Sequence, residues 1–538
     1  MNVVARGVGA ALSGTAPSRT PELQLAGLRV LVAGGGVAGM SAARYLLDAG
    51  AVVVIADDRL RGDSDVHDAA GADFTSVAAL LADRGWLQQT DLVVTSPGFA
   101  PANPLLVAAR DAAIPVWGEV ELAWRVDRAG LLGPPRTWLV VTGTNGKTTT
   151  TSMLTEIVSA SGRSAAACGN IGLPVLDAMR ATPRVEVLCA ELSSFQLYWA
   201  PSVAPDAGVV LNVADDHLDW HGSFEAYAAA KTVALHGTIG VVGLDDPVAS
   251  RLPVRGRRIG FTLGVPQPGE LGVVDGELVD RAFVGQPTPD GRQPPDGHTL
   301  AGRSLVAAAD ISPAGPSGIA DALAAAALAL TIGVTPATVA AALTAFRPGA
   351  HRGEVVATLD GIDFVDDSKA TNPHAAQAAV GARRRVVLIA GGLLKGASVD
   401  GLVAAVADRL AGVVVIGRDR DLIVEAIARH APKVPTVTVF TGDDGVVKAQ
   451  RATGPELGSP TGGPVSLLGT STDPAVAVME HAVTQAWRLA VAAAEKPDAI
   501  LLAPAAASLD MFAGYGRRGD AFAAAAKVLV GSASVPRP

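Results

Sequence analysis

Short apolar runs alternate along the chain with longer amphipathic or alanine-rich stretches. The sequence RVLVAGGGVAGMSAARYLLDAGAVVVIADD, which begins at residue 29, predicts a strand, a glycine turn, a helix and a second strand. Apolar runs predict further strands at residues 91–95, 138–141, 186–190, 207–212, 386–390, 413–416 and 499–502. Strands that alternate with helices pair in parallel, so the pattern predicts an α/β protein.

We expect three domains, each built on a mostly parallel sheet with flanking helices. The predicted organisation is a loose segment at residues 1–22, a Rossmann-like domain at 23–116, a P-loop ATPase-like domain at 117–348 and a Rossmann-like domain at 349–538. Two regions rich in glycine and proline interrupt the pattern. Residues 265–316 predict loops with a small irregular sheet, and residues 449–464 predict a surface excursion.

The composition argues against some classes of binding partner. The 538 residues are 49% apolar and 18% charged, and the net charge of −9 is opposite to the basic face that nucleic-acid binding requires. Two cysteines are too few for a disulfide scaffold and fit a reducing compartment. No strongly apolar run reaches the roughly 20 residues of a membrane helix. We therefore expect a cytoplasmic protein with small-molecule substrates, without nucleic acid or membrane insertion, and compatible with a monomer.

A glycine turn follows the first predicted strand. Gly34, Gly36 and Gly39 are in the G-x-G-x-x-G register of a dinucleotide site, and Asp57 ends the next strand, where it would meet a ribose hydroxyl. NAD is one ligand for such a unit, and a single nucleotide diphosphate is another. The turn at Ser96 to Gly98 lies at a further strand end, where open α/β sheets bind ligands.

A second glycine turn, GTNGKTT at residues 143–149, links a predicted strand to a predicted helix. Backbone N–H groups and the positive end of the helix would face a phosphate, Lys147 adds a charge, and Thr148 offers an oxygen to Mg²⁺. The spacing departs from the general G-x-x-x-x-G-K-[ST] loop, which would place a glycine at Val141.

Polar groups also end other predicted strands. Glu191 begins ELSSFQ and could supply a second oxygen to Mg²⁺, whereas His217, in the segment NVADDHLD, either joins a second metal or caps its loop. By residue type alone, Lys231 is a solvated or ion-paired lysine on a helix. In the last domain, DDSKATN at 366–372 carries Lys369, which pairs with a substrate anion or with a neighbouring aspartate.

Eight motifs occur in an order that resembles the Mur ligases, and they span nearly the whole chain. They are GTNGKTTT (143–150), GNIGLP (169–174), ELSSFQL (191–197), NVADDHLDWHGSFEAYAAAK (212–231), HR (351–352), DDSKATNP (366–373), GGLLKG (391–396) and PAAASLDMF (504–512). The ELSSFQL, SKATN and SLDxF signals are most similar to the family members that add D-glutamate.

The resemblance implies an ATP-dependent amide ligase of peptidoglycan synthesis, a pathway that supports cell shape and division. ATP would phosphorylate the alanyl carboxylate of UDP-N-acetylmuramoyl-L-alanine, and the amine of D-glutamate would then displace phosphate from the acyl phosphate. Such chemistry asks mainly for positioning and for charge neutralisation. Mg²⁺ is the implied metal.

The resemblance also implies a role for individual residues. The catalytic group would be Lys147, Glu191, His217, Lys231 and Lys369. ATP would bind Gly143, Thr144, Asn145, Gly146, Lys147, Thr148, Thr149, Arg352 and Asp367. The UDP-substrate would bind Gly36, Val37, Ala38, Gly39, Asp57, Arg59, Ser96, Gly98, Asn170 and His217. D-Glutamate would bind Lys369, Thr371, Lys395, Ser508, Leu509 and Tyr515. Mg²⁺ would bind Thr148 and Glu191, with His217 and Lys231 at a second ion.

In the family the lysine that matches Lys231 is carbamylated by CO₂. A carbamate is an anion with two oxygens, whereas a free ammonium would repel Mg²⁺. An acyl phosphate must also be kept from water, so we expect the last two domains to close about a hinge near residues 346–349.

The chain departs from the family pattern at several positions. Asp58 stands where a threonine is common, Tyr515 replaces a phenylalanine of a familiar relative, and the segment from Ser317 to Asp321 replaces His-Asn-x-x-Asn, which leaves the adenine contacts open. The 449–464 excursion has no clear family counterpart.

Three alternatives remain on sequence grounds. A Mur-type or folylpolyglutamate-type ligase could use a different amino acid, although no DNPR-type sequence of a diaminopimelate-adding enzyme is present. A nicotinamide oxidoreductase would leave GTNGKTT and SKATN unexplained. A non-catalytic nucleotide-binding protein would not need the intact set of Lys147, Glu191, His217 and Lys231.

Overall fold

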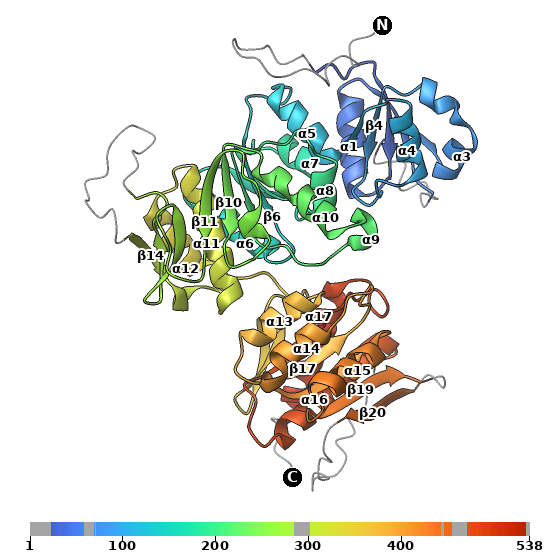
Figure 1. Cartoon of the computed structure of the whole chain (residues 1–538). Helices are drawn as coiled ribbons and strands as arrows, with labels where there is room; N and C mark the ends of the chain where they lie inside the picture. The colour runs from blue at the N-terminus through green and yellow to red at the C-terminus, as the bar shows by residue number, and fades with distance from the viewer. Residues whose placement is uncertain are drawn as a thin grey trace. The chain divides into compact units, whose positions relative to one another are not determined.

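A computed structural model describes residues 23–58, 69, 71–284, 302–442, 446–453 and 471–533. These residues form three sheets, all dominated by parallel strands, with helices packed against them (Figure 1). The α/β class and the three-sheet organisation predicted from the sequence are confirmed. Within the described part of the chain, none of the helices combines the length and the apolar character of a membrane span.

The first sheet is parallel throughout, in the order β3-β2-β1-β4-β5. Its strands are β1 (Arg29–Ala33), β2 (Val52–Ala56), β3 (Asp73–Thr75), β4 (Leu92–Thr95) and β5 (Val116–Gly118). The helices that accompany it are α1 (Val37–Asp48), α3 (Val77–Ala82), η1 (Arg84–Gln88), α4 (Pro104–Asp111), α5 (Glu119–Arg128) and α7 (Val175–Arg180).

The second sheet has the order β14-β13-β12-β11-β10-β9-β6-β8-β7. Its strands are β6 (Thr137–Thr142), β7 (Ala165–Gly169), β8 (Val187–Glu191), β9 (Ala207–Val210), β10 (Ile239–Gly243), β11 (Arg257–Phe261), β12 (Glu270–Val274), β13 (Glu277–Asp280) and β14 (Arg303–Ala307). Loops and a small irregular sheet were predicted within residues 265–316, but the antiparallel strands β13 and β14 extend the nine-stranded sheet and do not form a separate one. Residues 285–301 lie outside the described part.

The helices around the second sheet are α6 (Lys147–Ala160), α8 (Ser194–Tyr198), α9 (Leu218–His221), α10 (Phe224–Lys231), η2 (Thr232–Leu235), η3 (Ala249–Arg251), η4 (Ala308–Asp310), α11 (Pro316–Thr331) and α12 (Pro336–Ala345). Every residue from Ala322 to Ala329 in α11 is fully buried. Small alanine side chains let α11 lie close to α6 and to the sheet, so its composition is explained by packing.

The third sheet has the order β15-β16-β21-β17-β18-β19-β20 and is antiparallel only at its two edges. Its strands are β15 (Glu354–Leu359), β16 (Ile362–Asp366), β17 (Val386–Gly391), β18 (Leu410–Ile416), β19 (Thr436–Thr441), β20 (Val447–Thr453) and β21 (Ala499–Leu502). Its helices are α13 (Pro373–Gly381), α14 (Asp400–Val406), η5 (Ala407–Arg409), α15 (Arg420–His430), α16 (Pro474–Ala492) and α17 (Tyr515–Ala533).

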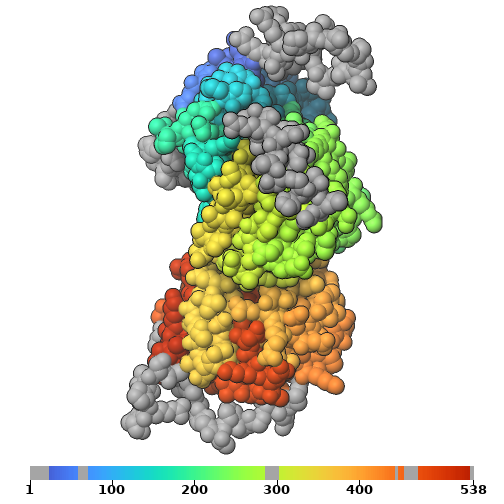
Figure 2. Space-filling model, turned by 90° about the vertical axis from the view of Figure 1, so that its left-hand side faces the viewer, coloured from blue at the N-terminus to red at the C-terminus, as the bar shows by residue number. Residues whose placement is uncertain are grey.

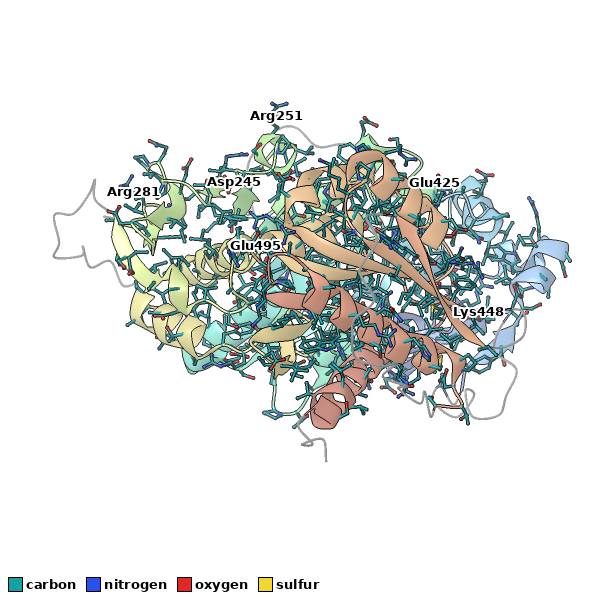
Figure 3. All side chains as sticks on the ribbon, turned by 90° about the horizontal axis from the view of Figure 1, so that it is seen from below. Asp245, Arg251, Arg281, Glu425, Lys448 and Glu495 are labelled. Carbon is teal, nitrogen blue, oxygen red and sulfur yellow. The ribbon has the colours of Figure 1, made fainter. Side chains whose placement is uncertain are left out.

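The third sheet is buried on both faces, as a mainly parallel sheet requires. Along β17, Val386, Leu388 and Ala390 join a core with α13, α14 and α15, while Val387 and Ile389 join the core with α16 and α17. Early and late segments of this part therefore adjoin, which is visible as neighbouring yellow, orange and red atoms in Figure 2. Charged side chains such as Glu425 extend outward (Figure 3).

The described residues form two compact units, and each unit combines segments that are separated along the chain. One unit contains the described part of Met1–Arg136 together with Pro174–Arg184 and Trp199–Ser202, and the second contains the remainder. In the first unit Asp177 of α7 pairs with Arg44 of α1 at 3.0 Å, and Glu119 Oε1 accepts from Leu176 N at 2.7 Å.

The predicted domain boundaries remain predictions. The first of them, between residues 116 and 117, falls inside strand β5, which pairs with β4 and belongs to the first sheet. The prediction of a surface excursion at 449–464 was wrong for its first residues, because Ala449 to Thr453 belong to β20 and pair with β19. Residues 454–464 lie outside the described residues.

Candidate functional site

The phosphate loop lies between the buried strand β6 and the helix α6, as the sequence predicted. Gly146 precedes α6 with a φ of 83°, a left-handed conformation that favours glycine, and a Cβ there would lie 2.2 Å from Asp321 Oδ1. The loop therefore requires glycine at this position both for its backbone and for its close neighbour.

One side chain outside the predicted set holds this loop. Asn212 Oδ1 accepts from the backbone N–H groups of Thr144 at 3.1 Å and Asn145 at 2.8 Å, and Asn212 Nδ2 donates to Asn145 O at 3.2 Å. Asn212 was part of a recognised motif, but its contacts depend on β9 lying beside β6, which the linear sequence does not state.

Two lysines converge on the start of the loop. Lys147 Nζ donates to Gly143 O at 3.0 Å and to Thr144 O at 2.9 Å, and Lys231 Nζ donates to Gly143 O at 2.8 Å. Lys231 is 1% exposed and also lies 4.5 Å from the centre of the Tyr227 ring. The expectation from residue type, a solvated or ion-paired lysine, was wrong for Lys231.

Burial lowers the pKa of both lysines. It lowers the pKa of Lys147, although the nearby carboxylate of Glu191 opposes the shift. Burial, followed by repulsion from Lys147, lowers the pKa of Lys231 well below its ordinary value. Both effects favour the neutral amine of Lys231.

Glu191 ends β8 beside this pair. It is 1% exposed, its Oε1 accepts from Asn170 Nδ2 at 2.8 Å, and its Oε2 has no hydrogen-bond partner among the described residues. A buried carboxylate oxygen without a donor is costly unless a cation or a donor reaches it. Glu191 therefore fits the role of a ligand to a hard cation such as Mg²⁺.

Aromatic rings surround the histidine motif. The ring of His217 lies 4.6 Å from that of Phe195, and its Nε2 lies 3.5 Å from Asp216 Oδ2. His221, which the sequence analysis had not singled out, pairs its Nε2 with Ser194 Oγ at 2.9 Å. Burial lowers the pKa of His221 to about 4, so this imidazole is neutral at neutral pH.

The described residues contain no group of three or more His, Cys, Asp or Glu side chains that could hold a metal by themselves. Mg²⁺ prefers oxygen ligands and commonly keeps substrate phosphates and waters in its shell. The available set, Glu191 and the half-buried Thr148 at the start of α6, therefore fits Mg²⁺ bound together with a nucleotide.

A second group of predicted residues gathers at the strand ends of the third sheet. Asp366 is fully buried and accepts from His351 Nδ1 at 2.7 Å and from Ser368 N at 2.9 Å. Lys369 Nζ lies 4.1 Å from the centre of the Tyr515 ring rather than in an ion pair with Asp366 or Asp367. Burial, followed by Arg352, lowers the pKa of Lys369.

Other residues predicted for this group differ in exposure. Ser508 is 3% exposed, whereas Leu509 is 66% exposed and Lys395 is exposed with a φ of 52°. Thr371 is half-buried, and the adjacent Asn372 caps α13 and donates from Nδ2 to Asn145 Oδ1 at 3.0 Å. Burial, followed by repulsion from Asp366, raises the pKa of Asp367 to about 7.

The residues predicted for the UDP-substrate fall in both compact units. In the first unit Asp57 Oδ2 accepts from Gly35 N at 2.9 Å, and Ser96 Oγ donates to Gly34 O at 3.1 Å, so these side chains shape the glycine turn. A Cβ at Gly39 would lie 1.8 Å from Gly34 O, and Val37 is 75% exposed. Ala38 and Gly98 lie in the same unit, Asn170 and His217 lie in the second unit, and Arg59 lies outside the described residues.

Three family models match the chain. They are "Mur ligase MurD-like, N-terminal domain" over residues 28–118, "Mur ligase middle domain" over 141–262 and "Mur ligase, glutamate ligase domain" over 351–457. The chain is also 54% identical to the UDP-N-acetylmuramoylalanine--D-glutamate ligase of Rhodococcus jostii, over 93% of this chain and 95% of that protein. The chain belongs to the Mur ligase family.

A second Mur ligase relative of the same name, from Mycolicibacterium smegmatis, is 52% identical over 94% of this chain and 97% of that protein. The solved UDP-N-acetylmuramate-alanine ligase of Thermotoga maritima has 18% identity and a TM-score of 0.45, covering 79% of this chain and 94% of that chain. The assignment of this Mur ligase rests on the sequence relatives and the family models.

Proposed function

We propose that this Mur ligase joins D-glutamate to UDP-N-acetylmuramoyl-L-alanine in peptidoglycan precursor synthesis, in the cytoplasm. The observation that carries the proposal is the group formed by Lys147, Lys231 and the partnerless oxygen of Glu191 around the phosphate loop. Relatives named for this reaction, about half identical over nearly the whole chain, support the choice of amino acid.

The reaction consists of two balanced transfers. A carboxylate oxygen of the alanyl group attacks the γ-phosphorus of ATP, and the bond to the β-phosphate oxygen breaks to release ADP. The amine nitrogen of D-glutamate then attacks the acyl carbon, the bond to the phosphate oxygen breaks, and the nitrogen loses a proton. Phosphate and an amide are the products.

Residues of the second sheet would handle the charge of the first transfer. Lys147, at the end of the phosphate loop, neutralises phosphate oxygens, and the loop amides not occupied by Asn212 remain available as donors. Thr148 and Glu191 would hold Mg²⁺, which when bound screens the negative charge that opposes attack on the γ-phosphate. Arg352 and Asp367 are proposed contacts of the nucleotide.

We assign the second metal position to His217 and to a carbamate of Lys231. The amine of Lys231 would attack the carbon of CO₂ and release one proton, which requires the neutral form that its buried surroundings favour. The product would be an anion beside the cationic Lys147, and the attraction between the two would stabilise the carbamate.

The strand-end loops of the third sheet would receive the amino acid. Lys369 offers a cation to a substrate carboxylate, while Thr371 and Ser508 offer hydroxyls and Lys395, Leu509 and Tyr515 complete the proposed contacts. For the first unit we propose that Gly36, Val37, Ala38 and Gly39, with Asp57, Arg59, Ser96 and Gly98, hold the UDP group. Asn170 and His217 would serve the diphosphate and sugar.

The test is phosphate release from ATP and Mg²⁺ with UDP-N-acetylmuramoyl-L-alanine, comparing D-glutamate with L-glutamate, L-alanine and meso-diaminopimelate, with the product mass confirmed. Release and ligation with D-glutamate alone is the expected result. Turnover with another amino acid and its matching acceptor would retain the ligase mechanism but overturn the specificity. No turnover with any pair would favour a non-catalytic nucleotide-binding protein.

A further inference from the structure

A buried arginine links three loops of the third sheet. Arg518, in α17, is 1% exposed, and the atoms that accept its side-chain hydrogen bonds lie at or just after the ends of strands. Its Nε donates to Ser368 Oγ at 3.0 Å and its Nη2 to Ser368 O at 2.9 Å, while its Nη1 donates to Ala506 O at 3.0 Å and Gly391 O at 3.4 Å. One guanidinium therefore contacts the ends of β16, β21 and β17, which are consecutive strands.

Each of these loops carries part of the proposed amino-acid site. Ser368 directly precedes Lys369, Ala506 lies two residues before Ser508, and Gly391 begins the turn that leads to Lys395. The second and third loops are also joined by the reciprocal backbone bonds of Leu393 and Ala507, at 2.8 and 2.9 Å. The relative position of the proposed contacts therefore depends on atoms that Arg518 holds.

The chemistry of arginine suits this task better than that of lysine. A planar guanidinium presents donors in several fixed directions, whereas an ammonium is a compact charge on a flexible stem. Arg518 donates to carbonyl and hydroxyl oxygens and, within the described residues, to no carboxylate; Asp366 and Asp510 act on it only as nearby charges. Burial lowers the pKa of Arg518 to about 10, so it stays cationic at neutral pH.

We propose that Arg518 is a positioning residue for the amino-acid substrate: it fixes the three loops relative to one another. The inference rests on the proposed function, because that function places D-glutamate at these loops. Arg518 does not touch the substrate and acts through Ser368, Ala506 and Gly391.

The test measures the KM for each of the three substrates in Arg518→Lys, Arg518→Gln and Ser368→Ala. The matched control is Arg517→Gln, because Arg517 is the neighbouring arginine and is exposed. Loss of charged hydrogen bonds to the loops should raise the KM for D-glutamate about tenfold in Arg518→Lys and further in Arg518→Gln. Ser368→Ala removes the hydroxyl that accepts from Nε and donates to Tyr515 O at 2.8 Å, but it keeps the bond from Nη2 to Ser368 O, so it should have a smaller effect in the same direction.

The KM values for ATP and the UDP-substrate should stay at the wild-type level in every variant that folds, and Arg517→Gln should match wild type throughout. An equal rise in all three KM values, or a lower melting temperature with an unchanged KM for D-glutamate, would overturn the proposal. If Arg518→Gln does not fold, Arg518→Lys and Ser368→Ala still decide it. Failure of wild type to use D-glutamate would instead refute the proposed function, independently of these comparisons.

Discussion

At the scale of single residues, burial decides which groups carry charge. Lys231 and Asp321 both lie within the second compact unit, and burial shifts the pKa of each towards its neutral form. For Lys231 the consequence is chemical, because only a neutral amine can react with CO₂. For Asp321 the consequence appears as a dependence of stability on pH.

Lys231→Ala should reduce ligation by at least about a hundredfold, because the proposed carbamate and its charge are both lost. Short-chain carboxylates should restore part of this activity by placing an anion in the vacated space. The measurement is phosphate release at increasing acetate or propionate, with Lys147→Ala as a control that carboxylates should not rescue. Removal of CO₂ from the buffer should lower wild-type activity, and activity that is indifferent to CO₂ would count against a carbamate.

Asp321→Asn should flatten the dependence of stability on pH. Thr150 Oγ1 donates to Asp321 Oδ1 at 2.9 Å, and an asparagine oxygen could accept the same bond. Burial raises the pKa of Asp321 from 3.8 to about 8, so the folded state keeps a proton that the unfolded state releases. Stability from this group is therefore complete below about pH 4 and is lost as pH rises to about 8.

The variant lacks this loss and should be more stable than wild type by at least about 1 kcal/mol at pH 8, with little difference near pH 4. Unfolding monitored from pH 4 to pH 8.5 measures the difference between the two proteins. Glu119 and Asp367, whose pKa values are raised to about 7, also make stability fall as pH rises. They do so equally in the wild type and in the variant, so their contribution cancels when the two proteins are compared. If the stability of the two proteins depended on pH in the same way, the assignment of a raised pKa to Asp321 would be contradicted.

At the scale of elements, the link between β6 and α6 is fixed from two sides. Asn212 holds Thr144 and Asn145, and Asp321 of α11 lies against Gly146. The loop is thus shaped before any ligand arrives, which reduces the entropy cost of holding phosphate. A change that disturbs this shape should affect the nucleotide more than the other substrates.

Gly146→Ala should raise the KM for ATP at least about tenfold, because the added Cβ meets Asp321 and the left-handed backbone is strained. Gly162→Ala is the matched control: Gly162 ends the same helix region with a φ of 85° and has nothing within 4 Å of an added Cβ. Both variants should lose about 1 kcal/mol of stability from backbone strain, and only Gly146→Ala should lose more and bind ATP poorly. Equal kinetic effects would show that the contact with Asp321 is unimportant.

At the scale of the whole molecule, the phosphate loop and the proposed amino-acid loops belong to different sheets. The connection runs through residues 346–353, between the end of α12 and the start of β15. Arg347 Nη1 donates to Phe346 O at 2.7 Å and to Thr344 O at 3.1 Å, so this arginine stays with the end of α12. A hinge at residues 346–349 remains a prediction based on the need to protect an acyl phosphate.

Small-angle X-ray scattering tests this prediction. The radius of gyration should fall when a non-hydrolysable ATP analogue and UDP-N-acetylmuramoyl-L-alanine are added together, because closure excludes water from the intermediate. D-Glutamate alone, without the nucleotides, should leave the scattering unchanged. Identical curves with and without the two nucleotides would exclude a closing motion of this size.

Local features of the sequence determined the strands, the glycine turns and the motif residues at strand ends. Apolar runs and glycines act through neighbouring residues, so β4, β6, β8 and the phosphate loop were predicted within a few positions. Local patterns also misled at one edge of the third sheet: glycine and proline near residue 449 suggested an excursion, but Ala449 to Thr453 pair with the preceding strand β19.

Tertiary structure alone decided which distant groups meet and how their charges behave. Asn212 reaches Asn145 because β9 lies beside β6, α7 joins the first unit although it follows β7 of the second sheet, and Arg518 reaches Ser368 across 150 positions. Burial, which shifts the pKa of Lys231 and leaves an oxygen of Glu191 without a donor, is likewise a property of packing. The sequence names the reactive groups, whereas exclusion of water and non-local contact give them their chemistry.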